Sequence, residues 1–113
     1  MRILFQDDEQ AILKIATMIF MDTDHTVLLS NSVAASRCAL SNDFDLLIID
    51  LNMGHEDTFD VLDIALQRKI DVWILSGCIT NYKARLLKYA PIIKRLLDKP
   101  DGFNIIIQEL CKK

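Results

Sequence analysis

The stretch DLLIID (residues 45–50) decides the fold of this chain. Four consecutive aliphatic residues stand between two aspartates, and an apolar run this short is typical of a strand buried on both faces. Such strands occur mainly in parallel sheets that are covered by helices on both sides. The stretch therefore predicts an α/β fold in which Asp50 ends a central strand.

Strand-like and helix-like segments alternate on both sides of this stretch. Strands are also predicted at residues 2–6, 25–30, 71–76 and 92–97, the last of them more polar and therefore an edge strand. Helices are predicted at residues 9–21, after a cap at Asn31 or Ser32, at residues 58–69 and 80–89, and after Pro100. This alternation predicts βαβ units with right-handed crossovers, and so a doubly wound parallel sheet.

Apolar spacing predicts which side of the first and last helices faces the sheet. The inward residues are predicted to be Ile12, Ile15, Ala16 and Ile19 in the first helix, and Phe103, Ile106, Ile107 and Leu110 in the last.

The length and the charge distribution add two expectations. A chain of 113 residues suits one domain, so we predict a single domain over residues 1–113. The net charge of −3 gives no reason to expect nucleic acid as a partner. Residues 1–82 carry 5 basic and 13 acidic side chains, whereas residues 83–113 carry 8 basic and 3 acidic ones. This asymmetry fits either chance placement or a basic docking face in the last third of the chain.

Cysteine and histidine usage indicates the compartment. Cys38, Cys78 and Cys111 form no CxxC pair and leave one cysteine over, which favours a reducing compartment. His25 and His55 stand at no metal-ligand spacing, so no zinc motif is visible. No apolar run approaches membrane-spanning length, and acids follow the short apolar N-terminal stretch at once. We therefore expect a soluble cytoplasmic protein.

Polar residues follow the predicted strands where α/β sheets form their binding crevice. Asp7 and Asp8 follow the first strand, Asp50 ends the third, Ser76 ends the fourth and Lys99 follows the fifth. Because the carboxyl ends of parallel strands meet at one edge, we expect these side chains to lie together. Crowded carboxylates resist ionisation unless a cation joins them, and Mg²⁺ or Mn²⁺ takes oxygen ligands. A carboxylate in such a site can accept a phosphoryl group, while an amine and a hydroxyl contact the phosphoryl oxygens.

These pieces together resemble the receiver domain of two-component response regulators. The matching segments are ILFQDDE (3–9), DLLIIDLNM (45–53), VWILSG (72–77) and LDKP (97–100), in the family order and across essentially the whole chain. The resemblance implies a CheY-like, flavodoxin-like α/β fold: a doubly wound five-stranded parallel sheet of order 2-1-3-4-5, flanked by five helices.

The resemblance also implies a role for each site residue. Asp50 would be the phosphoacceptor, Ser76 the switch hydroxyl and Lys99 the phosphate-binding amine. The metal ligands would be Asp8 directly, Asp7 through water, Asp50, and the backbone carbonyl of Asn52. The Lys99–Pro100 bond is expected to be cis. The phosphodonor would be a histidine kinase or a histidine phosphotransfer protein, and the only reactions would be the domain's own phosphoryl transfer and slow dephosphorylation.

In the family, the face made by helix four, strand five and helix five often binds a partner protein or a second copy of the chain. The basic residues expected on this face are Lys83, Arg85, Lys88, Lys94 and Arg95. They lead us to expect a downstream protein with an acidic surface. Direct contact with nucleic acid or with a membrane is not expected, because the net charge is negative and no apolar run is long enough to span a membrane.

Two departures from the family pattern keep other interpretations open. The loop after Asp50 lacks the usual proline, and Leu96 stands where an aromatic residue is common. They fit a degenerate receiver that binds partners without phosphorylation. A phosphatase of the haloacid-dehalogenase type uses similar residues, but there the nucleophile strand comes first and carries a second aspartate, where this chain has Asn52. Taken singly, each site residue also fits an ordinary role, such as a helix start for Asp7 and Asp8.

Overall fold

The computed structural model describes residues 1–111 of the chain. Its five parallel strands form one sheet in the order β2-β1-β3-β4-β5, as the family resemblance implies. The strands are β1 (Arg2–Gln6), β2 (Thr26–Ser30), β3 (Leu46–Ile49), β4 (Asp71–Ser76) and β5 (Ile93–Asp98). All five predicted strands are confirmed, and their bounds differ from the predicted ones by at most one residue at either end.

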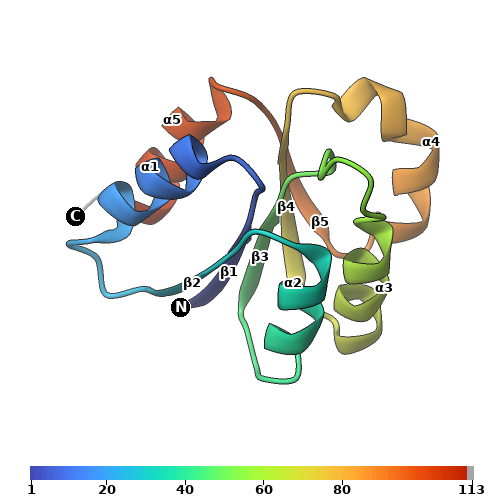
Figure 1. The fold of residues 1–113 in the computed structure, drawn as a ribbon, viewed down its shortest axis with the longest axis horizontal. Coiled ribbons are helices and arrows are strands. Elements are labelled where there is room, and N and C mark those ends of the chain that lie inside the picture. The colour runs from blue at the N-terminus through green and yellow to red at the C-terminus, as the bar shows by residue number, and fades with distance from the viewer. Residues whose placement is uncertain (112–113) are drawn as a thin grey trace.

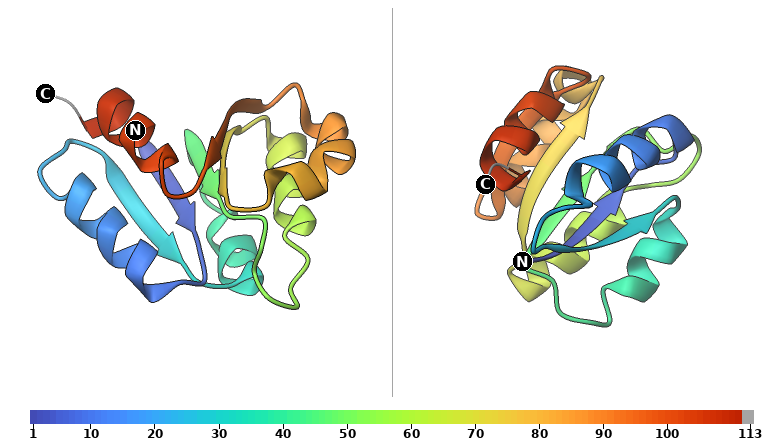
Figure 2. Two further views of the ribbon diagram at one scale, coloured as in Figure 1. Left: turned by 90° about the horizontal axis from the view of Figure 1, so that it is seen from above. Right: turned by 90° about the vertical axis from the view of Figure 1, so that its left-hand side faces the viewer.

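Helices cover both faces of the sheet, with α1 and α5 on one face and α2, α3 and α4 on the other (Figures 1 and 2). The helices are α1 (Gln10–Phe20), α2 (Val33–Ala39), α3 (Phe59–Arg68), α4 (Lys83–Leu86) and α5 (Gly102–Ile106). The predicted helix at residues 80–89 is in fact α4 between two 3₁₀ turns, Ile79–Tyr82 and Leu87–Tyr89. None of the helices among residues 1–111 is both long enough and apolar enough to cross a membrane.

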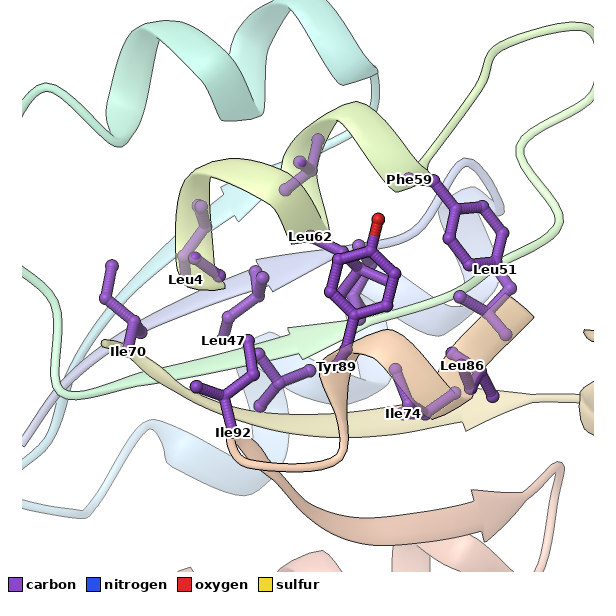
Figure 3. Packing of buried hydrophobic residues seen from close by; sticks show 14 of the residues in the cluster. Leu4, Leu47, Leu51, Phe59, Leu62, Ile70, Ile74, Leu86, Tyr89 and Ile92 are labelled. Atoms are coloured by element: carbon purple, nitrogen blue, oxygen red, sulfur yellow. The ribbon is translucent and has the colours of Figure 1, made fainter. Parts of the chain in front are cut away.

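The central strand β3 is buried on both faces, as its sequence predicts. Leu47 and Ile49 belong to the core under α2, α3 and α4, whereas Leu46 and Ile48 belong to the core under α1 and α5. Figure 3 shows the first of these cores, in which strand residues such as Leu47 pack beneath Leu62 of α3. Because helices cover both faces of β3, the four residues between Asp45 and Asp50 are all apolar instead of alternating with polar residues.

The predicted inward faces of α1 and of the closing helix are each wrong at one position. In α1 the buried residues are Leu13, Ala16 and Phe20, while Ile15 is 40% exposed. In the closing helix Ile107 is 42% exposed. There a π-helical segment, Ile107–Cys111, follows α5, and its wider turn rotates the later residues away from the α-helical phase.

Local signals set several element boundaries. Ser32, rather than Asn31, caps α2, and its hydroxyl accepts the Ala35 N–H at 3.0 Å. Lys69 ends α3 in the left-handed region, with φ 59°.

The edge strand β2 leaves two apolar side chains exposed, Leu28 at 48% and Leu29 at 37%. The predicted edge position of β5 is confirmed.

Candidate functional site

Four acidic side chains gather at the carboxyl ends of β1 and β3. Ligand atoms of Asp7, Asp8, Glu9 and Asp50 all lie within 4.8 Å of one another. Asp7 and Asp50 are buried, whereas Asp8 and Glu9 are exposed. The structure thus brings together the three predicted acids and adds Glu9, which was not predicted although it directly follows the acid pair.

The sheet itself fixes the two buried acids. The Asp7 N–H donates to the Ser30 carbonyl of β2 at 3.0 Å, and the Asp50 N–H donates to the Gln6 carbonyl of β1 at 3.0 Å. The backbone ladder therefore continues one residue beyond each strand. Because both backbones are held by a neighbouring strand, the two carboxylates project from fixed positions.

Lys99 joins this cluster from the end of β5. Its Nζ lies 2.6 Å from Asp7 Oδ2, 2.8 Å from Asp50 Oδ2 and 3.5 Å from Glu9 Oε1. The Lys99 N–H also donates to the Ser76 carbonyl at 3.3 Å, which aligns the ends of β4 and β5. The Lys99–Pro100 bond is cis, as expected.

Both carboxylate oxygens of Asp50 accept hydrogen bonds, whereas only one carboxylate oxygen of Asp7 does. Asp50 Oδ2 accepts from Lys99, and Oδ1 accepts the Asn52 N–H at 3.0 Å. Asp7 Oδ1 accepts the Glu9 N–H at 2.9 Å. Asp7 Oδ2 is paired with Lys99 by charge, but outside hydrogen-bond geometry, so this buried oxygen has no hydrogen-bond partner among the described residues.

Burial and charge shift two pKa values in this cluster. Burial raises the pKa of Asp7 above its usual 3.8, and this outweighs the lowering by Lys99 and by the Glu9 N–H. Burial opposes the charged form of Lys99, but its hydrogen bond to Asp50, its ion pair with Asp7 and the negative charges of both carboxylates raise its pKa above the usual 10.5. Four carboxyl groups thus face one ammonium, which leaves the cluster with excess negative charge.

The cluster fits a hard divalent cation. Its donors are carboxylate oxygens, which Mg²⁺ prefers, and four carboxyl groups share the single ammonium of Lys99. A cavity of about 460 Å³ opens on the same side chains, and Asp8, Asp50, Asn52 and Lys99 are among its lining residues. These residues could hold the ion and leave room for a phosphoryl group beside it.

Ser76 lies at the same edge of the sheet, but its hydroxyl makes contacts within its own turn. Ser76 Oγ lies 3.2 Å from Cys78 Sγ and accepts the Cys78 N–H at 3.3 Å. Gly77 and Cys78, rather than Ser76, line the cavity. The predicted switch role of Ser76 therefore stays a prediction.

The loop after Asp50 is closed by its own hydrogen bonds, without the proline that is usual in the family. The Glu56 N–H donates to the Met53 carbonyl at 3.3 Å across Gly54, whose φ of +69° favours glycine. The Thr58 hydroxyl donates to the Leu51 carbonyl at 3.1 Å. Glu56 Oε2 accepts the Val33 N–H at 3.1 Å, which anchors this loop on the start of α2.

Sequence comparison finds relatives among bacterial regulators. No protein-family model matches the chain. Over 84 residues the chain is 39% identical to the alginate biosynthesis transcriptional regulatory protein AlgB of Pseudomonas putida. This match covers 74% of the chain but 18% of AlgB, so the chain spans less than a fifth of the length of this relative.

Structural comparison finds the same fold in solved receiver domains. A CheY-like response regulator receiver domain protein from Methanospirillum hungatei JF-1 superposes with a TM-score of 0.80 at 18% identity, covering 95% of this chain and 88% of that one. The response regulator TrrA from Thermotoga maritima, solved in complex with Mg(2+)-BeF, superposes with a TM-score of 0.75 at 19% identity, covering 96% and 94%.

The sheet order and the acidic cluster at its carboxyl edge define a CheY-like α/β domain. Fold and sequence similarity together place the chain among the receiver domains of response regulators. Domains of this class are signalling domains rather than classical enzymes.

Proposed function

We propose that residues 1–113 form one cytoplasmic receiver domain that accepts a phosphoryl group on Asp50 in a Mg²⁺-dependent reaction. The donor would be a histidine kinase or a histidine phosphotransfer protein. The observation that carries the proposal is the contact of Lys99 with Asp50, 2.8 Å long, inside a cluster of four acids. A buried carboxylate with an amine on one side and acids on the other suits phosphoryl transfer, which depends on positioning and charge neutralisation.

In the proposed reaction an Asp50 oxygen attacks the phosphorus of a phosphohistidine. The new P–O bond forms as the P–N bond breaks, and the imidazole nitrogen leaves with the electron pair. The Asn52 N–H orients the Asp50 carboxylate, and Lys99 places a positive charge beside the incoming phosphoryl oxygens. Ser76 would exchange its contact with Cys78 for one of these oxygens.

Asp7, Asp8, Asp50 and the Asn52 carbonyl would hold the metal ion. When bound, the ion supplies positive charge opposite the transferring group. The excess negative charge of the cluster, four carboxyl groups around one ammonium, supports this part of the proposal.

Phosphorylation would then shift a pre-existing equilibrium and change which protein binds. We propose that the downstream protein, or a second copy of the chain, docks on the face of α4, β5 and α5. An apolar groove of about 530 Å³ lies there, and Leu87 and Leu96 in its lining are 75% and 50% exposed. Contiguous exposed apolar surface of this kind is typical of a protein interaction site.

The predicted basic character of this face needs refinement. Three of its five basic residues form ion pairs within the chain: Arg85 with Asp57, Lys88 with Asp63, and Arg95 with Glu109. Lys83 and Lys94 also line the groove, and neither forms an ion pair in the described part of the chain. We therefore propose that apolar contact dominates docking, with these two lysines favouring an acidic partner.

Incubation with acetyl phosphate and Mg²⁺, followed by intact mass spectrometry, tests the proposal. The wild type should gain the mass of one phosphoryl group in the presence of Mg²⁺, and Asp50→Asn should gain none. Asp45→Asn is the matched control, because Asp45 lies at the opposite end of β3 and accepts the Arg2 N–H at 2.8 Å.

Phosphoryl mass retained in Asp50→Asn would move the acceptor to another residue. A wild type that never gains mass and binds no Mg²⁺ would instead support the phosphorylation-independent receiver.

A further inference from the structure

We propose that Arg85 and Asp57 position the site loop, residues 52–58, from α4, so that filling of the acidic pocket and the position of α4 are coupled. This inference rests on the proposed function and adds to it two positioning residues outside the pocket. Neither residue belongs to the acidic cluster or lines its cavity.

The contact between the site loop and α4 is built around Phe59, the first residue of α3. Asp57 Oδ1 accepts the Phe59 N–H at 3.0 Å and lies 3.6 Å from Arg85 Nη2. The Arg85 guanidinium in turn lies over the Phe59 ring, 3.8 Å from its centroid. Arg85 therefore contacts Asp57, at the end of the site loop, through an ion pair, and Phe59, at the start of α3, through a cation–π interaction.

The chain around α4 encloses the same ring. The rings of Tyr82 and Tyr89 lie 5.6 Å and 5.8 Å from Phe59, centroid to centroid. Figure 3 shows Phe59 beside Leu51, with Tyr89 reaching from the chain around α4 toward α3. Because packed side chains leave little free volume, Phe59 cannot be displaced without also moving Tyr82, Arg85 and Tyr89.

The other end of the site loop touches the proposed phosphoacceptor. The Asn52 N–H donates to Asp50 Oδ1, and Asn52 and Gly54 line the cavity. The Thr58 hydroxyl holds the Leu51 carbonyl, so the two ends of the loop are tied to each other. A continuous set of contacts thus leads from the Asp50 carboxylate through the site loop to Arg85.

A second connection, from the pocket to the face of α4, β5 and α5, would run through Ser76 and Leu96. The Ser76 hydroxyl contacts Cys78 in its own turn, and Leu96 is half exposed. Besides the chain segment that leads from Gly77 and Cys78 of the cavity through Ile79–Tyr82 into α4, the side-chain contacts described above connect the pocket with α4 through the site loop. Because Arg85 and Asp57 are 56% and 59% exposed in their side chains, the ion pair is weak and its loss should change binding by about two- to fivefold.

The test is a double-mutant cycle on the full chain, with Mg²⁺ and beryllofluoride as the probe and backbone amide NMR as the readout. Arg85→Gln and Asp57→Asn should each weaken binding of the probe by about two- to fivefold, and the double variant should bind no more weakly than either single variant. The amide introduced by Asp57→Asn would keep an oxygen for the Phe59 N–H, so the start of α3 is preserved. Arg85→Lys should recover part of the loss because it keeps the positive charge.

A second readout separates coupling from general loosening. In the wild type the probe should shift amide signals of both the site loop and α4, whereas in Arg85→Gln the α4 shifts should fall to less than about half while those of the loop persist. Lys88→Gln is the matched control, since Lys88 pairs with Asp63 of α3 at 3.1 Å rather than with the site loop. It should behave as the wild type in both readouts.

Unchanged binding and unchanged α4 shifts in Arg85→Gln would overturn the inference, and so would losses that add in the double variant. A wild type that binds no Mg²⁺ and beryllofluoride would be a different failure, because it contradicts the proposed function itself.

Discussion

The ammonium of Lys99 lies between two buried carboxylates, 2.6 Å from Asp7 Oδ2 and 2.8 Å from Asp50 Oδ2. One cation from the end of β5 thus joins the ends of β1 and β3, although these strands are not its neighbours in the sheet. The same contact serves stability and the proposed chemistry, because an unpaired buried carboxylate is costly.

Replacing Lys99 by glutamine should lower the free energy of unfolding by about 3 kcal/mol at neutral pH, since it leaves Asp7 and Asp50 without their cation. The folded-state pKa of Lys99 is raised, so its contribution is complete below its usual pKa of 10.5 and is lost as pH rises through the higher folded value. The loss in the variant should shrink in mild acid, because the pKa of Asp7 is raised by burial and its carboxyl group then takes up a proton. Urea unfolding followed by Trp73 fluorescence measures both effects.

Lys14→Gln, on the exposed side of α1, is the control for this measurement and should change the free energy of unfolding by less than about 0.5 kcal/mol. A loss in Lys99→Gln that is the same at neutral pH and in mild acid would contradict the charge-pairing explanation.

Mg²⁺ should stabilise the folded chain. At a concentration about tenfold above its Kd, the ion should add about 1.4 kcal/mol to the free energy of unfolding. Thermal unfolding in MgCl₂, compared with NaCl at equal ionic strength and after addition of EDTA, measures this effect. Asp7→Asn should remove most of it because Asp7 Oδ2 is the buried oxygen without a hydrogen-bond partner, and Asp45→Asn should not. Equal stabilisation of both variants would place the ion elsewhere.

Gly102→Ala should destabilise the chain by about 1–3 kcal/mol, because the added methyl group has no space. A Cβ at Gly102 would lie 2.7 Å from Leu75 Cδ1 and 2.7 Å from Leu97 Cβ, and the second contact cannot be relieved by side-chain rotation. Gly77→Ala is the matched control, since a Cβ there meets nothing within 4 Å. Urea unfolding of the two variants should separate them clearly, and equal stability would show that α5 can shift away from β5 at little cost.

The phenol of Tyr89 should lose its proton at a higher pH than that of an ordinary tyrosine. Burial and its 2.5 Å hydrogen bond to Asp63 raise the pKa of Tyr89 to about 12. Because the folded state holds this proton more tightly, stability should be constant below about pH 10 and should fall as pH rises from the unfolded pKa toward the folded one. Absorbance of the tyrosinate measures the titration, and Asp63→Asn should bring it to lower pH. A single ordinary titration of both tyrosines would contradict this prediction.

The sequence predicts the sheet and the acid cluster well because both depend on strand ends. Strand ends are marked by where the apolar runs stop, and parallel topology then brings Asp7, Asp50 and Lys99 to one edge. The phase of a helix is harder to predict: Ile15 fits an apolar stripe as well as Leu13 does, and only the docking angle of α1 decides between them. The π-helical segment that begins at Ile107 has no local signal in the sequence.

The charge of the docking face could not be predicted from residue counts. Arg85 and Lys88 look like free cations in the sequence, but their partners Asp57 and Asp63 lie far earlier in the chain. Ion pairs between elements appear only once the elements are placed in space. In the sequence Glu9 looks like an ordinary acid at the start of a helix. Only the folded chain places it beside Lys99 and Asp50.

The edge strand β2 has a consequence for the behaviour of the chain at high concentration. Its sequence TVLLS carries no charge, and Leu28 and Leu29 are exposed beside an unpaired row of backbone groups. An uncharged apolar edge of this kind can add a strand from another molecule and so start aggregation. A lysine in place of Leu28 would interrupt that edge on the side of the sheet away from α1 and α5, which makes it a practical substitution for obtaining concentrated, monodisperse samples.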